Sequence, residues 1–235
     1  MQAREVQEER ADFRHVEDWI FDLDNTLYRA DSRIFDQIEA RMAAYVERLL
    51  GVERDEARRI QKAYYREHGT TLNGLIRIHG VDPEDFLDCV HDIDLESLAP
   101  DPVLNAALDR LPGRRFVFTN GCRRHAARVL GRIGLSAHID EVWDIRTTAF
   151  TPKPFDAAYA NVVEQAKLAP ERAAMFDDLK RNLVPARALG MTTVWIDTGS
   201  VWSTQGPDLP AADEAQVDHT TTDLSEFLSA IRIAS

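Results

Sequence analysis

Short apolar runs rich in β-forming residues alternate with helical stretches from about residue 115 onward, and this alternation constrains the fold more than any other feature. Strands that alternate with helices in this way build βαβ units and a mostly parallel sheet. We therefore predict an α/β fold with a Rossmann-like, doubly wound parallel sheet. The predicted strands span residues 19–23, 115–119, 141–145, 173–176 and 192–196, and the predicted helices lie near 123–133, 154–167, 179–189 and 223–233.

The segment between the first two predicted strands has a different texture. Apolar side chains from Ile34 to Leu49 recur on one helical face, and the pairs Asp82-Pro83 and Asp101-Pro102 are each typical of an N-cap followed by proline in the first turn. We therefore expect an all-helical cap domain inserted after the first strand. The expected domains are the core, residues 1–31 and 112–235, and the cap, residues 32–111. The stretch from 202 to 215 is expected to be irregular.

Composition narrows the class of protein. The formal net charge of -12 argues against nucleic acid polymers as partners, because binding their phosphates needs positive charge. The two cysteines lie far apart without CxxC spacing, so neither a disulfide framework nor a zinc site is favoured. The N-terminus is too charged for a secretory signal, and no apolar run reaches the length of a membrane span. We expect a cytoplasmic protein, monomer or homodimer, without a membrane partner.

Polar residues follow four of the predicted strands at the point where each strand ends. Taken singly, the Asp and Thr-Asn clusters are typical of a turn or a helix N-cap, and a lysine flanked by prolines is typical of a solvated loop. In an open parallel sheet, however, ligands bind beyond the carboxyl ends of the strands, so we expect the four clusters to meet in one crevice. In chain order they are Asp22 with Asp24, Thr119 with Asn120, Lys153, and Asp177 with Asp178.

These residue types favour phosphoryl transfer through an aspartyl phosphate. Crowded carboxylates repel one another unless a divalent cation neutralises them, and oxygen ligands favour Mg²⁺. Asp22 would attack phosphorus, while Asp24, which faces the same way two residues later, would protonate the leaving group and then activate water. Thr119 through its hydroxyl, Asn120 through its backbone N–H and Lys153 through its charge would bind the phosphate oxygens.

Asp178 would complete the ligands of the metal, with Asp177 and Asn182 just outside them. The motifs FDLDNTLY, FTN, the Lys of TPKP and FDD, in this order, resemble those of haloacid dehalogenase superfamily phosphatases. The resemblance implies that Mg²⁺ is held by the Asp22 side chain, the main-chain oxygen of Asp24 and Asp178. It also implies that the helical insert is a mobile cap. The chain departs from the family pattern at Asn182, where Asp is frequent.

A narrower resemblance covers residues 64–145. The stretches YYREHGTTLNGL, VHDIDLESLAPDPVL and LPGRRFVFTNGCRRHA together are similar to the pyrimidine 5'-nucleotidase branch, whose members remove phosphate from UMP- and CMP-like mononucleotides. Thr70, Thr71 and Asn73 either form a helix stop followed by an N-cap, or lie in a cap loop that contacts the base or sugar. The sequence does not assign roles to His68, His91, His125 or Cys122.

Other functions stay open at this point. A dehalogenase does not need the proton-donating Asp24, whereas a phosphomutase uses the same motifs and differs only in its products. An inactive relative that serves as a binding scaffold should have lost at least one of Asp22, Asp24, Lys153 or Asp178, and all four are present. Phosphoglycolate, a sugar phosphate or pyridoxal phosphate are the alternative substrates.

Overall fold

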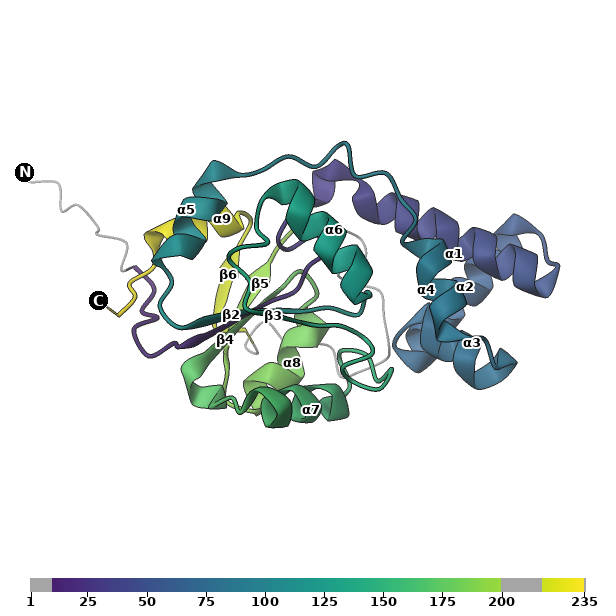
Figure 1. Cartoon of the computed structure of the whole chain (residues 1–235). Helices are drawn as coiled ribbons and strands as arrows, with labels where there is room; N and C mark the ends of the chain where they lie inside the picture. The colour runs from purple at the N-terminus through teal and green to yellow at the C-terminus, as the bar shows by residue number, and fades with distance from the viewer. Residues whose placement is uncertain (1–9, 200–216, 235) are drawn as a thin grey trace, which may run out of the picture.

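The structure, a computed structural model, describes residues 10–199 and 217–234. Its core is a six-stranded sheet in the order β3-β2-β1-β4-β5-β6, in which every neighbouring pair is parallel (Figure 1). The predicted Rossmann-like parallel sheet is therefore confirmed. The strands are β1 (Asp18–Phe21), β2 (Arg114–Phe118), β3 (Glu141–Trp143), β4 (Ala173–Asp177), β5 (Thr192–Ile196) and β6 (His219–Thr221).

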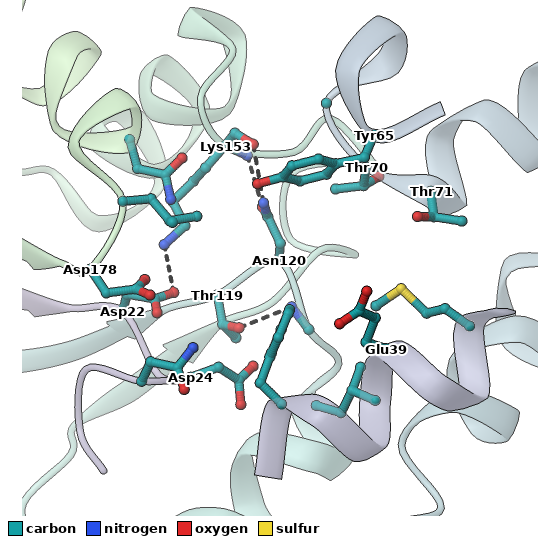
Figure 2. A pocket seen from close by; sticks show the side chains of 18 of the residues that line it. Asp22, Asp24, Glu39, Tyr65, Thr70, Thr71, Thr119, Asn120, Lys153 and Asp178 are labelled. Carbon is teal, nitrogen blue, oxygen red and sulfur yellow. Dashed lines mark hydrogen bonds and ion pairs between the residues drawn. The ribbon is translucent and has the colours of Figure 1, made fainter. Parts of the chain in front are cut away.

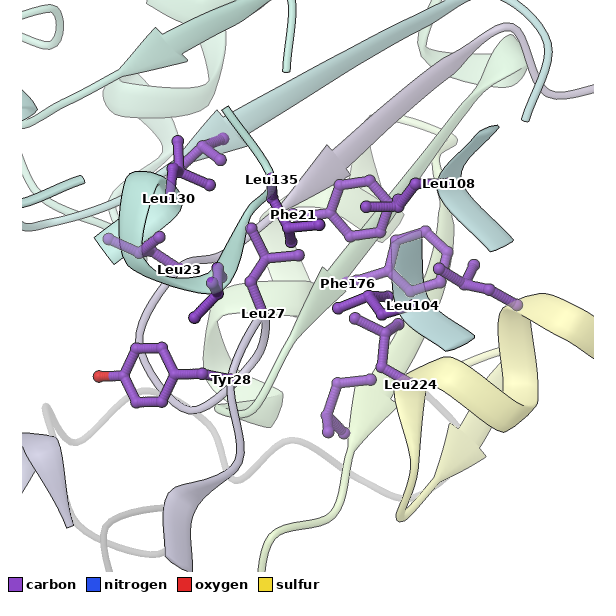
Figure 3. Close-up of a cluster of buried hydrophobic side chains, with 14 of the residues drawn as sticks. Phe21, Leu23, Leu27, Tyr28, Leu104, Leu108, Leu130, Leu135, Phe176 and Leu224 are labelled. Carbon is purple, nitrogen blue, oxygen red and sulfur yellow. The ribbon is translucent and has the colours of Figure 1, made fainter. Parts of the chain in front are cut away.

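Helices cover both faces of the sheet, because alternate strand residues point to opposite sides. Phe21 and Phe176 face the layer of α5, α6 and α9, where a large cluster of buried leucines packs against them (Figure 3). Ile20 and Met175 face the opposite layer, which contains α7 and α8. The elements of the two layers are α5 (Pro102–Arg110), α6 (Arg123–Ile133), α7 (Asp156–Ala166), α8 (Lys180–Ala188) and α9 (Leu224–Ala230), with short 3-10 helices η1 (Ala30–Ser32) and η2 (Pro170–Arg172).

Four helices after β1 form a separate layer beside the core (Figure 1). They are α1 (Ile34–Leu50), α2 (Arg54–His68), α3 (Thr71–His79) and α4 (Pro83–Val90). The predicted N-cap at α4 is confirmed, since Asp82 accepts a hydrogen bond from Glu84 N, with Pro83 in the first turn. Tyr45 of α1 and Phe86 of α4 belong to the apolar cluster that joins these helices, and Cys122 of the core packs into the same cluster.

Helix α5 falls within the expected cap range of 32–111, yet it packs with the core. Leu104 and Leu108 belong to the same cluster as Phe176, and the N-cap Asp101 accepts a hydrogen bond from Ser225 at the start of α9. An amphipathic helix pattern fixes which face is apolar but not which partner covers that face. We propose that the cap comprises α1 to α4 and that α5 belongs to the core.

Strand β6 was not predicted, and α9 confirms the expected closing helix. The expected irregular stretch from 202 to 215 lies outside the described residues. Among the helices of residues 10–199 and 217–234, none is long and apolar enough to cross a lipid bilayer.

Candidate active site

The polar residues that follow the strands line one cavity between the sheet and the cap (Figure 2). Asp22 directly follows β1, Thr119 directly follows β2, and Asp177 is the last residue of β4. Because β1 lies between β2 and β4, these three strand ends are neighbours in space. The predicted core residues that line the cavity are Asp22, Asp24, Thr119, Asn120, Lys153, Asp178 and Asn182.

Lys153 holds two of the strand ends together. Its Nζ donates to Asp22 Oδ1 and to Asp177 Oδ2, both at 2.7 Å, and the side chain is almost fully buried. Burial alone would lower the pKa of Lys153, but the charges of Asp177 and Asp22 outweigh it and raise that pKa above its ordinary value. The site therefore contains a fixed positive charge beside Asp22.

Asp177 serves as the support of Lys153. Both of its carboxylate oxygens accept hydrogen bonds from Asn182 Nδ2, at 2.9 and 3.0 Å, and Leu179 N donates to Oδ1 at 2.9 Å. These contacts leave Asp177 fully engaged by protein groups, so it does not need a ligand. Asn182 thus binds the acid that anchors Lys153, which gives a structural reason for an amide where the family often has Asp.

Two further contacts shape the phosphate side of the cavity. The Asn120 side chain accepts from Lys153 N at 2.8 Å and donates to Lys153 O at 3.0 Å, so it fixes the loop that carries the lysine. Thr119 Oγ1 accepts from Gly121 N at 2.9 Å, and its hydroxyl proton can still be donated to a ligand. The Thr119 hydroxyl is therefore available for the expected contact with phosphate, while the expected role of the Asn120 backbone N–H stays a prediction.

The acids of the site suit a divalent cation. Carboxylate oxygens of Asp22, Asp177 and Asp178 lie within 4.8 Å of one another, and when all three are ionised they leave two excess negative charges against the single charge of Lys153. Burial and the charges of neighbouring acids raise the pKa of Asp22 to about 7, and that of Asp178 well above its usual range. Hard oxygen donors with an unbalanced charge fit Mg²⁺. We propose that Asp22, Asp178 and the main-chain oxygen of Asp24 hold it.

The raised pKa values predict a pH-dependent effect of Mg²⁺ on stability. Between about pH 4 and pH 7 the folded, metal-free protein holds more protons at Asp22 than the unfolded chain does, so its stability falls as the pH rises through this window. Mg²⁺ at about 100 times its Kd should stabilise the folded state by about 2.7 kcal/mol at about pH 8, a rise in Tm of roughly 5 to 10 °C. At about pH 5.5, protons compete with the cation and the rise should be less than half.

Thermal melts with and without Mg²⁺ at both pH values measure this effect, and Asp178→Asn is the control in which it should disappear. An equal rise in Tm at both pH values, or one that persists in Asp178→Asn, would contradict the proposed ligands.

Asp24 lies in a hydrogen-bond network that the sequence did not reveal. Its Oδ1 accepts from the Tyr28 hydroxyl at 2.7 Å and is 2.8 Å from His125 Nε2. Burial would raise the pKa of Asp24, but the contacts of its Oδ1 with His125 and Tyr28 favour the carboxylate and outweigh burial, so the pKa lies below its ordinary value. Tyr28 follows four residues after Asp24 in the first motif, which is a signal available in the sequence, whereas His125 is brought there only by the fold.

The cap supplies the other side of the cavity, opposite the acids (Figure 2). Thr70 and Thr71 line it at the start of α3, while Asn73 does not. The Thr70 side chain accepts from Asn73 N, and the Asn73 amide donates to His68 O, so the loop includes the N-cap that was one of the two interpretations. The remaining cap residues of the lining are Phe35, Ile38, Glu39, Met42, Gln61, Lys62, Tyr65, Gly69 and His91 at the end of α4.

Gly69 brings this loop against the segment that carries Lys153. A Cβ at Gly69 would lie 2.5 Å from Phe155 Cε2 and 3.1 Å from Pro152 Cγ, and its φ of +84° is one that other residues rarely adopt. Glycine is therefore required for this approach. From the core side, Arg181 of α8 lines the cavity and stacks on Tyr65 of the cap, at 4.8 Å from the ring centre.

Together the parallel α/β core, the inserted cap and the acidic site define the class, and sequence comparison agrees. The family model of haloacid dehalogenase-like hydrolases matches residues 20–190. The chain therefore belongs to the haloacid dehalogenase-like hydrolase family, which confirms the superfamily resemblance of its motifs. The family match does not test whether the chain belongs to the pyrimidine 5'-nucleotidase branch.

Among curated proteins, the chain is similar to Phosphate metabolism protein 8 of Saccharomyces cerevisiae, with 27% identity over 191 residues. The match covers 74% of this chain and 59% of the yeast protein, so the chain spans about three fifths of that relative's length.

Solved structures of the same fold include proteins named as phosphatase, hydrolase and dehalogenase. A HAD phosphatase from Thermococcus onnurineus has a TM-score of 0.58 at 19% identity and covers 92% of this chain and 100% of its own. The putative HAD-hydrolase YfnB from Bacillus subtilis, bound to magnesium, has a TM-score of 0.58 at 15% identity, with 93% and 99% covered. L-2-haloacid dehalogenase from Xanthobacter autotrophicus has a TM-score of 0.55 at 15% identity, and the match covers 91% of this chain and 97% of the dehalogenase. At these identities the likeness shows the fold alone.

Proposed function

We propose that the protein is a Mg²⁺-dependent phosphomonoester hydrolase that acts through an aspartyl phosphate on Asp22. The observation that carries the proposal is the second acid, Asp24, which lines the same cavity and is held by Tyr28 and His125. Displacing a halide from carbon needs no proton donor, whereas an alkoxide leaving from phosphorus does. A well-supported acid beside the nucleophile therefore favours phosphate ester hydrolysis over dehalogenation.

The reaction proceeds in two steps. The negative charge of the bound phosphate raises the pKa of Asp24, so that Asp24 takes up a proton as the substrate binds. An Asp22 oxygen attacks phosphorus, the bond from phosphorus to the ester oxygen breaks, and Asp24 gives this proton to the departing alkoxide. Water then attacks phosphorus and gives a proton to Asp24, the bond between Asp22 and phosphorus breaks, and inorganic phosphate leaves. Lys153 and Thr119 stabilise the charge on the phosphoryl oxygens during both steps. When bound, Mg²⁺ supplies charge neutralisation between Asp22 and the phosphate.

For the leaving group, we propose a pyrimidine nucleoside 5'-monophosphate such as UMP or CMP, which would make the enzyme a 5'-nucleotidase. The support beyond the motifs is the polar lining of the cap. Gln61 is buried, lines the cavity, and has an amide oxygen without a hydrogen-bond partner among the described residues. A pyrimidine base offers N–H and C=O groups at its edge, and an amide can pair with either kind.

A smaller phosphomonoester is the second candidate, and the size of the cavity favours it. The volume of about 150 Å³ is below the roughly 300 to 1,000 Å³ of pockets that enclose drug-sized ligands. A phosphoryl group with a short alcohol, as in phosphoglycolate or a small sugar phosphate, fits this volume directly. A mononucleotide requires that the cap opens further, as hinged lids do.

A phosphate-release assay decides between the two candidates. The panel holds UMP, CMP, a purine mononucleotide, phosphoglycolate, sugar phosphates, pyridoxal phosphate and 4-nitrophenyl phosphate, each with Mg²⁺ and with a chelator. The nucleotidase proposal expects the highest kcat/KM for UMP or CMP. A preference for phosphoglycolate or a sugar phosphate would contradict the nucleotidase proposal and leave the proposed phosphatase activity standing. If no ester released phosphate, both proposals would be contradicted. Isomerised phosphate esters among the products would indicate a mutase.

The cap loop should carry selectivity rather than chemistry. Thr70→Val is expected to lower kcat/KM for UMP or CMP about 3- to 10-fold, the worth of one hydrogen bond, and to leave 4-nitrophenyl phosphate nearly unchanged. The ratio of the two specificity constants is the measurement, because it does not depend on the folded fraction.

Thr70→Ser is the matched control for this variant. Serine keeps the hydroxyl and the N-cap of α3, so the ratio should stay at the wild-type value. Gln61→Met, which removes the amide at similar size, should change the ratio as Thr70→Val does. A parallel fall for both substrates in Thr70→Val would mean that the loop is structural and would remove local support for the nucleotide.

A further inference from the structure

His125 lies in the first turn of α6, fully buried, and directs its ring at Asp24. Its Nε2 is 2.8 Å from Asp24 Oδ1, and the Tyr28 hydroxyl is 2.7 Å from the same oxygen. The Tyr28 hydroxyl is the donor of this hydrogen bond. Two groups from distant parts of the chain thus converge on one oxygen of a carboxylate that lines the cavity.

The surroundings of His125 fix which ring nitrogen carries the proton. His125 Nδ1 is buried and has no hydrogen-bond partner among residues 10–199 and 217–234. A proton on Nδ1 would be an unmet buried donor, whereas a proton on Nε2 is shared with Asp24, so Nε2 is the donor.

A second histidine holds the plane of the ring. His91 stacks on His125, with ring centroids 4.5 Å apart and planes inclined by 14°. Arg128, one turn further along α6, donates to His91 O at 2.7 Å and so ties His91 to the helix that carries His125.

We propose that His125 is a positioning residue for the acid and base Asp24, a role that rests on the proposed phosphomonoester hydrolysis. With Oδ1 held by His125 and Tyr28, Oδ2 is the oxygen that exchanges the proton with the leaving group and with water. Oδ1 accepts the same two hydrogen bonds whether Oδ2 is protonated or not. Asp24 can therefore alternate between acid and base without turning its carboxyl group.

The leaving group of the ester reveals this role. An alkyl or nucleoside oxygen needs the Asp24 proton as its bond to phosphorus breaks, whereas 4-nitrophenolate departs without one. The constant kcat/KM reports the steps up to formation of the aspartyl phosphate, before water enters. A fault in the position of Asp24 should therefore lower kcat/KM for the alkyl ester alone.

The experiment compares kcat/KM for 4-nitrophenyl phosphate with that for the best alkyl phosphate of the panel, in wild type, His125→Ala and His125→Gln. In His125→Ala, the alkyl ester should lose about 10²-fold and the nitrophenyl ester less than about 5-fold. Glutamine offers an N–H near the place of Nε2 and should recover at least about a tenth of the lost activity. His138→Gln is the control: His138 binds Asn105 and Asp109 away from the site, so the ratio should equal that of the wild type.

The outcomes separate the two proposals. A larger loss for the alkyl ester in His125→Ala with recovery in His125→Gln supports the positioning role. Equal loss for both esters, or an unchanged ratio, would overturn the role of His125 and leave the phosphatase standing. Hydrolysis of neither ester by the wild type with Mg²⁺ would overturn the proposed function, and with it the role of His125.

Discussion

We expect Asp22→Asn to abolish the proposed phosphomonoester hydrolysis, with a loss of about 10⁴-fold or more, comparable to the loss of a nucleophile in other covalent mechanisms. Asparagine is nearly isosteric, and its Oδ1 can still accept from Lys153, so the geometry of the site survives. The substitution removes the nucleophilic oxygen, and it removes one of the negatively charged ligands that we propose for Mg²⁺. Phosphate release from the best substrate of the panel measures the loss, and circular dichroism with a thermal melt measures the fold.

Asp18→Asn is the matched control for this variant. Asp18 begins the same strand at its opposite end and binds Arg114 through two hydrogen bonds of 2.7 and 2.9 Å. The control should therefore lower Tm without lowering kcat of the folded enzyme. Chelator-stripped wild type should be inactive and should recover when Mg²⁺ returns. Wild-type turnover by Asp22→Asn, or by the stripped enzyme, would exclude the aspartyl phosphate mechanism.

The sequence predicts which strand-end residues come together at the cavity, because each motif is local and the parallel order of the strands brings the motifs to one edge of the sheet. Once β1, β2 and β4 are known to be parallel neighbours, Asp22, Thr119 and Asp177 must meet at one edge. The prediction that Asp22 and Asp24 face the same way likewise rests on their spacing alone and not on any other element. Even the departure at Asn182 is intelligible afterwards, since its amide binds the acid that supports Lys153.

Contacts between distant segments account for what the sequence did not predict. His125 and Asp24 are 101 residues apart, and neither the TNGCRRHA stretch nor the first motif indicates that they touch. Strand β6 has only three residues and no apolar run; Asp218 just before it aligns the pair by accepting hydrogen bonds from Thr193 N and Oγ1 of β5, both at 2.9 Å. In each case the signal is a pairing, which periodicity along one segment cannot carry.

Asp24→Asn separates the acid from the nucleophile. The variant should keep Mg²⁺ and phosphate binding, because the proposed metal contact of Asp24 is its main-chain oxygen, but should lose about 10²- to 10⁴-fold in kcat for alkyl phosphates. The amide oxygen of asparagine can still accept from Tyr28 and His125, so the network around the side chain is preserved while the exchangeable proton is lost. Calorimetric titration with Mg²⁺ and steady-state phosphate release measure the two properties.

Rapid mixing with 4-nitrophenyl phosphate separates the acid role of Asp24 from its base role within one experiment. In Asp24→Asn the first step needs no acid for this ester, so about one equivalent of nitrophenolate per active site should appear in a burst. Turnover then slows, because the water that hydrolyses the aspartyl phosphate lacks its base. Adding His125→Ala to Asp24→Asn should lower the alkyl ester rate little further, since both changes act through one carboxyl group. Equal losses of Mg²⁺ affinity and rate in Asp24→Asn, with no burst, would assign Asp24 to the metal rather than to the proton.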